Sequence, residues 1–183
     1  MGERTHAGWR SRGYLPHFDA PNLIQHIVFG LADALPPGER NEADLDKGHG
    51  ECLLRDARIA SIAEATLLHE DGERYRLIAW CVMPNHVHAI FEQLPGAPLA
   101  DVLQSWKSVS AHRINALLGR KGRLWRREYF DRYMRDVNDL RGTVAYVHCN
   151  PVEAGLCKDP ADWRFSSAYR RWHALERGDD LDV

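Results

Sequence analysis

Two histidines and a tyrosine–asparagine pair are the residues of this chain whose types and spacing could do chemistry. His86 and His88 lie in "WCVMPNHVHAIFE" (residues 80–92), which is typical of a buried strand. Side chains alternate along a strand, so both imidazoles face one side, about 7 Å apart at the backbone and within reach of one metal ion. Neutral imidazole is the commonest metal ligand in proteins. The alternative is two surface histidines on a half-exposed strand.

A third ligand and a nucleophile could come from "YVHCNP" (residues 146–151). Tyr146 and Asn150 are four residues apart, hence on one face of a predicted helix. An amide oxygen suits Mg²⁺ or Mn²⁺, and a phenol can form covalent intermediates once it loses a proton whose ordinary pKa is about 10. A tyrosine on a helix is more often a core residue, so this pair alone carries little information.

The elements that must position these residues follow from hydrophobic periodicity. Strands are predicted at 22–30, 73–83, 86–94 and 123–135, and helices at 55–70, 99–118 and 136–150. Gly119 is expected to end the second helix and Pro151 the third. Residues 33–50, rich in Pro, Gly and acid, are expected to form a long solvated loop.

The order β-α-β-β-α-β-α, with right-handed crossovers, predicts an α+β fold of the ferredoxin-like plait type. Such a plait has an antiparallel sheet with two helices on one face, and here a C-terminal catalytic helix would follow. The length of 183 residues suits a single domain spanning 1–183.

Composition gives few further clues. The formal net charge is −2, which indicates no particular partner for the chain as a whole. No apolar run resembles a signal peptide or approaches about 18 residues, so we expect no membrane span. Four scattered cysteines without a CxxC pair are typical of a reducing cytosol, and a cytoplasmic protein is therefore expected.

Basic residues gather in one acid-free segment, from Trp106 to Arg127. Such segregation predicts phosphate contacts, and aromatic side chains among the cations could stack on unpaired bases. A solvated helix face with its tryptophans in the core is the alternative. The aromatic residues are Trp106, Trp125 and Tyr129, and the cations are Lys107, Arg113, Arg120, Lys121, Arg123, Arg126 and Arg127.

Together these motifs resemble those of the REP-associated tyrosine transposases, relatives of the single-tyrosine insertion-sequence transposases. The segment "MPNHVHAIFE" is similar to the HUH motif (histidine, hydrophobic, histidine) of single-strand DNA nucleases. The matching blocks, in the family's order, are "WRSRGYLPHFDAP" (9–21), "WCVMPNHVH" (80–88), "SWKSVSAHRIN" (105–115), "REYFDRYMRD" (127–136), "YVHCNPVEAGL" (146–156) and "DWRFSSAYR" (162–170).

The resemblance implies a metal-dependent single-strand DNA endonuclease that cleaves and rejoins DNA at REP-type hairpins through a 5′-phosphotyrosine intermediate. His86, His88 and Asn150 would hold Mg²⁺ or Mn²⁺, and Tyr146 would be the nucleophile. The expected partner is single-stranded or hairpin DNA, bound by a monomer or homodimer in the nucleoid.

The resemblance also implies where the DNA lies. An N-terminal arm (residues 1–21) would recognise a short tetranucleotide at the foot of the hairpin, and residues 157–183 would form a C-terminal tail. The expected DNA contacts are Arg10, Arg12, Gly13, Lys107, Arg113, Arg123, Arg126 and Arg127.

Three other hypotheses remain open: a hairpin-binding protein without chemistry, an RNA-binding module with the same plait, and a relaxase or rolling-circle initiator. The four intact site positions argue against the first, and histidines in place of exposed aromatics against the second. His26 departs from the family's pattern on the first strand and is expected to be a packing or edge residue. His148 is expected to be structural or solvent-facing.

Overall fold

The computed structural model describes residues 8–11, 16–39 and 41–177. Its strands are β1 (Gly8–Ser11), β2 (Pro16–Asp19), β3 (Ile24–Gly30), β4 (Tyr75–Val82), β5 (His86–Gln93) and β6 (Phe130–Tyr133). Its helices are η1 (Glu42–Lys47), η2 (Leu53–Arg55), α1 (Ala57–Leu68), α2 (Leu99–Leu117), α3 (Val137–Glu153), η3 (Pro160–Asp162) and α4 (Ser167–Arg177). None of the described helices is both long and apolar enough to span a bilayer.

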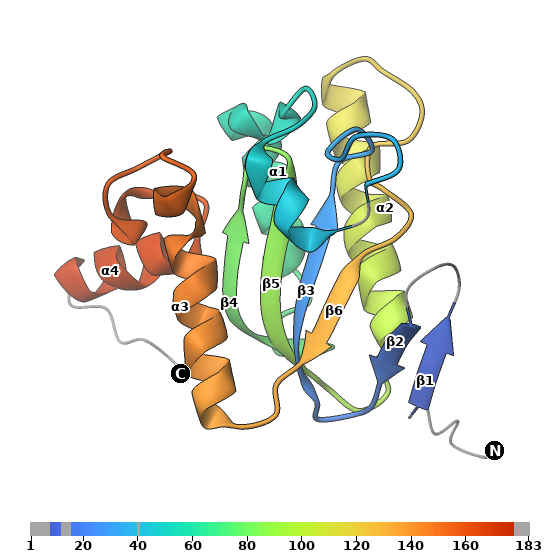
Figure 1. The fold of residues 1–183 in the computed structure, drawn as a ribbon, viewed down its shortest axis with the longest axis vertical. Coiled ribbons are helices and arrows are strands. Elements are labelled where there is room, and N and C mark those ends of the chain that lie inside the picture. Colours follow the sequence, from blue (N-terminus) through green and yellow to red (C-terminus); the bar gives the residue numbers. More distant parts are fainter. Residues whose placement is uncertain (1–7, 12–15, 40, 178–183) are drawn as a thin grey trace.

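The predicted plait is confirmed. Four strands form an antiparallel sheet in the order β4-β5-β3-β6, with α1 and α2 inserted in the chain between strands as expected. The two central strands, β3 and β5, pair from Ile24↔Glu92 to Gly30↔His86. Figure 1 shows this sheet at the centre, with α3 and α4 beside β4 and the β1-β2 hairpin beside β6.

Two clusters of buried side chains lie on the two faces of the sheet. The larger cluster joins the face that carries Phe29 and Phe91 to α1 and α2. Trp106 and Trp125 are 1% and 4% exposed and belong to it, so the core interpretation holds for both and neither can stack on a base. The smaller cluster joins the opposite face to α3, through Val147. The α3 helix therefore lies against the face that carries the even-numbered residues of β5.

The expected strand 123–135 forms only over Phe130–Tyr133. Residues 123–129 instead cross the end of the sheet as a loop. Trp125 forms a single bridge with Leu31, and the Lys107 ammonium donates to the backbone oxygens of Arg126 and Arg127, both at 3.1 Å. The buried Trp125 thus fixes this loop by side-chain packing, which leaves no room for a continuous strand.

The third helix was expected to end at Pro151, but it continues to Glu153. Proline lacks a backbone N–H and so removes one hydrogen bond from a helix. The loss is small here, because Pro151 is the first of the last three residues of α3. The Asp136 side chain caps the beginning of α3 by accepting from the backbone N–H groups of Asn138 and Asp139. Gly155, at φ 68°, follows its end. The helix is thus long enough to carry both Tyr146 and Asn150 across the sheet.

The expectation of a solvated loop at 33–50 is wrong for its central part. Residues 42–47 form η1, in which Leu45 is 1% exposed. A Cβ on Gly30 would lie 2.9 Å from Leu45 Cδ2, so glycine at the end of β3 permits this close approach. An acidic segment is therefore held against the end of the sheet.

The C-terminal segment packs against β4, one of the two edge strands of the sheet. The backbone N–H of Val82 donates to the Phe165 oxygen at 2.8 Å, and the Trp80 N–H donates to Ser167 Oγ at 3.0 Å. Trp163 Nε1 donates to the Val82 oxygen at 3.0 Å. These contacts cover backbone groups that an edge strand would otherwise expose.

Candidate active site

The two histidines of β5 lie side by side and are both fully buried, at 0% exposure. Their Nε2 atoms are 2.8 Å apart. They share the face of the sheet that α3 covers, as the alternation along the strand predicts. The alternative of two surface histidines on a half-exposed strand is wrong, because α3 and η1 close over them.

The orientation of the His86 ring is set by the residue before it. Asn85 Nδ2 donates to the backbone oxygens of Leu45 and His49 at 3.0 and 3.1 Å, which turns its Oδ1 toward His86 Nδ1 at 2.8 Å. An amide oxygen only accepts, so Nδ1 carries the proton and Nε2 presents its lone pair to the site. Burial lowers the pKa of His86 to about 4, which keeps the ring neutral.

The α3 helix places Tyr146 and Asn150 opposite the histidines, on one face as predicted. The two ring centroids of Tyr146 and His88 are 5.7 Å apart, with the rings nearly perpendicular at 89°. Asn150 is 2% exposed. The structure therefore brings the four predicted site residues together at one end of the sheet.

Asp46, from η1, is the centre of this site, and it was not predicted as a site residue from the sequence. Its Oδ1 lies 3.2 Å from His86 Nε2 and 3.9 Å from His88 Nε2. Tyr146 Oη donates to its Oδ2 at 3.1 Å, and Asn150 Nδ2 donates to its Oδ1 at 3.3 Å. The only sequence signal was an apolar Leu45 inside the acidic run "EADLDK", which suggests a turn packed on something rather than a solvated loop.

The electrostatics of the site depend on this carboxylate. Burial raises the pKa of Asp46, but the adjacent ring nitrogens of His86 and His88 outweigh burial and hold that pKa well below its usual range. Burial raises the pKa of Tyr146 well above its ordinary value, and the Asp46 charge adds to the rise. Two imidazole nitrogens and a carboxylate oxygen this close require a positive charge among them, either a shared proton or a cation.

The donor set fits a divalent metal ion. Ligands about 2.1 Å from an octahedral ion lie about 3.0 Å apart at right angles. The distances from His86 Nε2 to His88 Nε2 (2.8 Å) and to Asp46 Oδ1 (3.2 Å) are close to this value, and the distance from His88 Nε2 to Asp46 Oδ1 is longer, at 3.9 Å. Asn150 Oδ1 is buried and has no hydrogen-bond partner in the described part of the chain, although a buried carbonyl normally has one. Imidazole nitrogens with carboxylate and amide oxygens are the donors that such ions accept.

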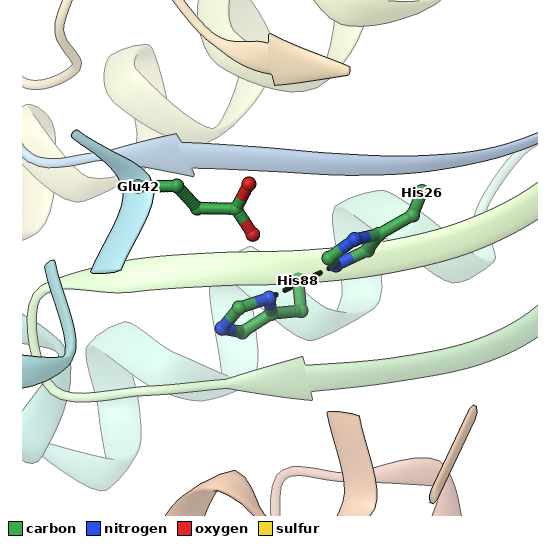
Figure 2. Close-up of side chains that lie close together, drawn as sticks. All are labelled: His26, Glu42 and His88. Atoms are coloured by element: carbon green, nitrogen blue, oxygen red, sulfur yellow. Dashed lines mark hydrogen bonds between the residues drawn. The ribbon is translucent and has the colours of Figure 1, made fainter. Parts of the chain in front are cut away.

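His26 belongs to the site as well, which corrects the expectation of a packing or edge residue. It is 4% exposed, and its Nε2 lies 3.1 Å from His88 Nδ1 (Figure 2). Burial lowers the pKa of His26 well below its ordinary value, and the charges of His88 and Arg132 lower it further. A carboxylate oxygen of Glu42, from η1, lies within 4.8 Å of ring nitrogens of both histidines.

His148 is a structural residue, as predicted. Its Nε2 lies 2.7 Å from Ser167 Oγ at the beginning of α4. Burial lowers the pKa of His148 to about 4, so its ring is neutral. The side chain therefore ties α3 to the C-terminal segment and points away from Tyr146.

The predicted DNA contacts fall into separate groups. Arg123 and Arg127 are exposed on the loop that crosses the end of the sheet, and the Arg126 backbone N–H donates to the Gly30 oxygen at 2.9 Å. Gly30 pairs with His86, so this loop lies at the same end of the sheet as the histidines.

Lys107 and Arg113, two further predicted DNA contacts, lie outside that loop, on α2. The Lys107 ammonium is bound to backbone oxygens of the loop, as described above, and burial lowers the pKa of Lys107 to about 8. Arg113 lines a groove of about 1240 Å³ between α1, β4 and α4, with Trp80. Trp80 and His88 stand on opposite faces of the sheet, because their β4–β5 pairs are neighbours in the register. Arg10 lies in β1, whereas Arg12 and Gly13 lie outside the described residues.

Comparisons with known proteins bear on the family to which this chain belongs. Residues 57–150 match the family described as "Transposase IS200 like". The REP-associated tyrosine transposase of Escherichia coli K12 is 30% identical over 96 residues, which cover 52% of this chain and 56% of the relative. A putative REP-associated tyrosine transposase of Haemophilus influenzae is 26% identical over 107 residues, covering 52% of this chain and 60% of the relative.

The chain therefore spans a little over half of the length of these curated relatives. The solved structure of a REP-associated tyrosine transposase bound to a REP hairpin shares the fold, with a TM-score of 0.64 and 19% identity over 92% of this chain and 88% of that chain. The resemblance to REP-associated tyrosine transposases inferred from the motifs is confirmed. Since the family match covers more than half of its residues, the chain belongs to the IS200-like transposases.

Proposed function

We propose that the protein is a metal-dependent single-strand DNA transesterase that cleaves and rejoins DNA beside hairpins. One observation carries the proposal: the Tyr146 hydroxyl and the Asn150 amide bind the same carboxylate, Asp46, that lies against the nitrogens of both HUH histidines. A nucleophile and a set of cation ligands thus meet within a few ångströms.

His86, His88, Asn150 and Asp46 are the residues that would hold the ion. A divalent ion held there would polarise a phosphate oxygen and stabilise the charge that develops in the transition state. The described residues of the site supply the rest: α3 carries the nucleophile, β5 carries the histidines, and η1 closes the site from the end of the sheet.

The reaction needs one oxygen nucleophile and one leaving oxygen. Tyr146 Oη attacks the phosphorus of a single-stranded phosphodiester, the bond from phosphorus to the 3′ oxygen breaks, and that oxygen leaves as a free 3′-hydroxyl after gaining a proton. The 5′ end stays on Tyr146 as a phosphotyrosine. A second 3′-hydroxyl can reverse the step on another strand, because the energy of the phosphodiester is kept in the phosphotyrosine bond.

The phenol must lose its proton as it attacks, and its pKa is raised in this site. Asp46 Oδ2, at 3.1 Å, is the acceptor within hydrogen-bond reach of the hydroxyl. We propose that Asp46 directs the phenol oxygen through this hydrogen bond, and that the phenol proton passes to solvent water as the oxygen attacks.

The proposed substrate is a DNA hairpin with a single-stranded flank, of the kind present in the structure of the hairpin-bound relative. The loop of residues 123–129, which carries Arg123, Arg126 and Arg127 and is called the cationic loop below, supports a DNA substrate. It lies at the histidine end of the sheet, where phosphates that approach Tyr146 would pass beside it. The arm formed by residues 1–21, which includes β1 and β2, is proposed to recognise the foot of the hairpin.

A cleavage assay tests this function. An end-labelled oligonucleotide with a palindrome taken from the DNA that flanks the gene is incubated with protein, first in EDTA and then with Mn²⁺ or Mg²⁺ restored. We expect cleavage at one position beside the hairpin, only with the divalent ion present. Cleavage that persists in EDTA would contradict the metal role, and no cleavage of any flanking palindrome with either ion would contradict the proposed function.

The cationic loop is expected to bind phosphates. Replacing Arg123, Arg126 and Arg127 by alanine should weaken hairpin binding and lower the slope of log affinity against log salt by about 0.7 to 0.9 for each phosphate that is no longer neutralised. Fluorescence anisotropy at several salt concentrations measures both quantities. Arg76→Gln is the matched control, because Arg76 is exposed at the other end of β4, paired with Glu92 at 3.0 Å. An unchanged slope in the triple variant would make the loop an ordinary solvated surface.

A further inference from the structure

We infer that His26 is a positioning residue that fixes the ring of His88 and thereby the affinity of the site for its metal ion. The inference rests on the proposed function, since it concerns the ion that the site is proposed to hold. His26 would not touch the ion or the DNA. It would act on His88 alone, through one hydrogen bond.

The sheet register brings the two rings together. Val28 pairs with His88 and His26 pairs with Ile90, so His26 is a diagonal neighbour of His88 on the face covered by α3. The nitrogens His26 Nε2 and His88 Nδ1 are 3.1 Å apart, and the ring planes differ by only 8°. The ring centroids are 5.3 Å apart, so the hydrogen-bonded nitrogens lie almost on the line between the two parallel rings, and the dashed line in Figure 2 marks this bond.

The chemistry of imidazole gives this bond its direction when an ion is held. His88 turns Nε2 toward His86 and Asp46, so its lone pair must be on Nε2 and its proton on Nδ1. A buried N–H needs an acceptor. His26 Nε2, 3.1 Å away, is the acceptor within hydrogen-bond reach of His88 Nδ1.

His86 and His88 are therefore oriented in the same way by different partners. Asn85 Oδ1 accepts from His86 Nδ1, and His26 Nε2 accepts from His88 Nδ1. Both bonds leave the Nε2 lone pairs directed at one point. Removing such a partner from a metal-binding histidine typically lowers metal affinity about 10- to 100-fold.

Glu42 completes the surroundings of the pair. Its carboxylate points toward both rings in Figure 2, within 4.8 Å of their nitrogens. A second ion held by His26, Glu42 and His88 would require His88 to bind metal through both nitrogens, which removes its last ring proton. The hydrogen-bonded arrangement keeps that proton, so we expect one ion per chain.

The test measures metal binding by the full chain without DNA. Free Mn²⁺ is followed by electron paramagnetic resonance in wild type, His26→Phe, His26→Gln and Ile27→Val. His26→Phe fills the space without an acceptor and should lower Mn²⁺ affinity about 10- to 100-fold. His26→Gln supplies an amide oxygen and should restore most of it. Ile27→Val alters β3 on the opposite face, and its affinity should equal that of wild type.

Several results would overturn the inference. These are a folded His26→Phe with wild-type affinity, an equal loss in His26→Gln, or two ions per wild-type chain. Should His26→Phe fail to fold, nitrogen-15 NMR of the Zn²⁺-loaded wild type decides, because a His88 Nδ1 without a proton contradicts it. Wild type that binds no Mn²⁺ at all would instead count against the proposed function.

Discussion

Replacing Tyr146 with phenylalanine is expected to abolish DNA cleavage and the covalent protein–DNA adduct, while hairpin binding and metal affinity survive. The change removes one oxygen, the proposed nucleophile, and leaves His86, His88 and Asn150 in place. Loss of a nucleophile typically lowers the rate by more than about 10⁴-fold. Cleavage is measured with the labelled hairpin on a denaturing gel, and binding by anisotropy with the same oligonucleotide.

Two other tyrosines are matched controls for this variant. Tyr133 is 41% exposed on β6, and Tyr129 packs its ring 5.2 Å from the Lys107 ammonium. Tyr129→Phe and Tyr133→Phe should keep full activity. The loss of the Tyr146 hydrogen bond to Asp46 should cost only about 1 kcal/mol of unfolding free energy. Retained cleavage by Tyr146→Phe would remove Tyr146 from the mechanism.

The second large effect is expected at the histidine pair. His86→Ala and His88→Ala should each abolish metal-dependent cleavage and weaken Mn²⁺ binding in the absence of DNA. Each takes away one of two nitrogens that converge at 2.8 Å, and the remaining ligands cannot hold the ion as tightly. Titration with Mn²⁺ and the cleavage assay measure the two losses separately.

The burial of these rings changes what their removal should do to stability. Both are 0% exposed, so each alanine variant leaves buried polar groups without partners and should lose about 1–3 kcal/mol in urea unfolding. His148→Ala is the matched control, because it removes a neutral histidine of α3 that faces Ser167. It should be destabilised without loss of metal binding. Full cleavage by His86→Ala or His88→Ala would end the metal role of that residue.

Much of the fold was predictable because it depends on local patterns. The two-residue spacing of His86 and His88 and the four-residue spacing of Tyr146 and Asn150 fix which face each side chain takes, whatever lies opposite. The alternation of helix and strand patterns was sufficient to give the plait and its antiparallel sheet. The chain order then places the α3 helix across the face that carries the histidines.

The missing parts of the site depend on contacts between distant segments. His26 reaches His88 only through the register of β3 with β5, which no local pattern in "NLIQHIVFG" encodes. Asp46 enters the site only because Leu45 packs against Gly30. An acidic stretch with proline and glycine has the composition of a solvated loop until that packing is known. The length of β6 was overestimated for the same reason. Trp125 fits the alternating pattern of a strand, but its side chain is held in the core and the segment around it is a loop.

The proposed roles of the site residues all depend on one claim, that Tyr146 forms a covalent bond to DNA in the presence of a divalent ion. Mapping that bond tests the claim most directly. Wild-type protein is incubated with Mn²⁺ and a hairpin oligonucleotide, the covalent adduct is isolated on a denaturing gel, and its peptides are sequenced by mass spectrometry. The proposed function predicts a phosphodiester to the 5′ end of the cleaved strand on Tyr146. DNA attached to any other residue, or cleavage without a covalent adduct, would contradict it.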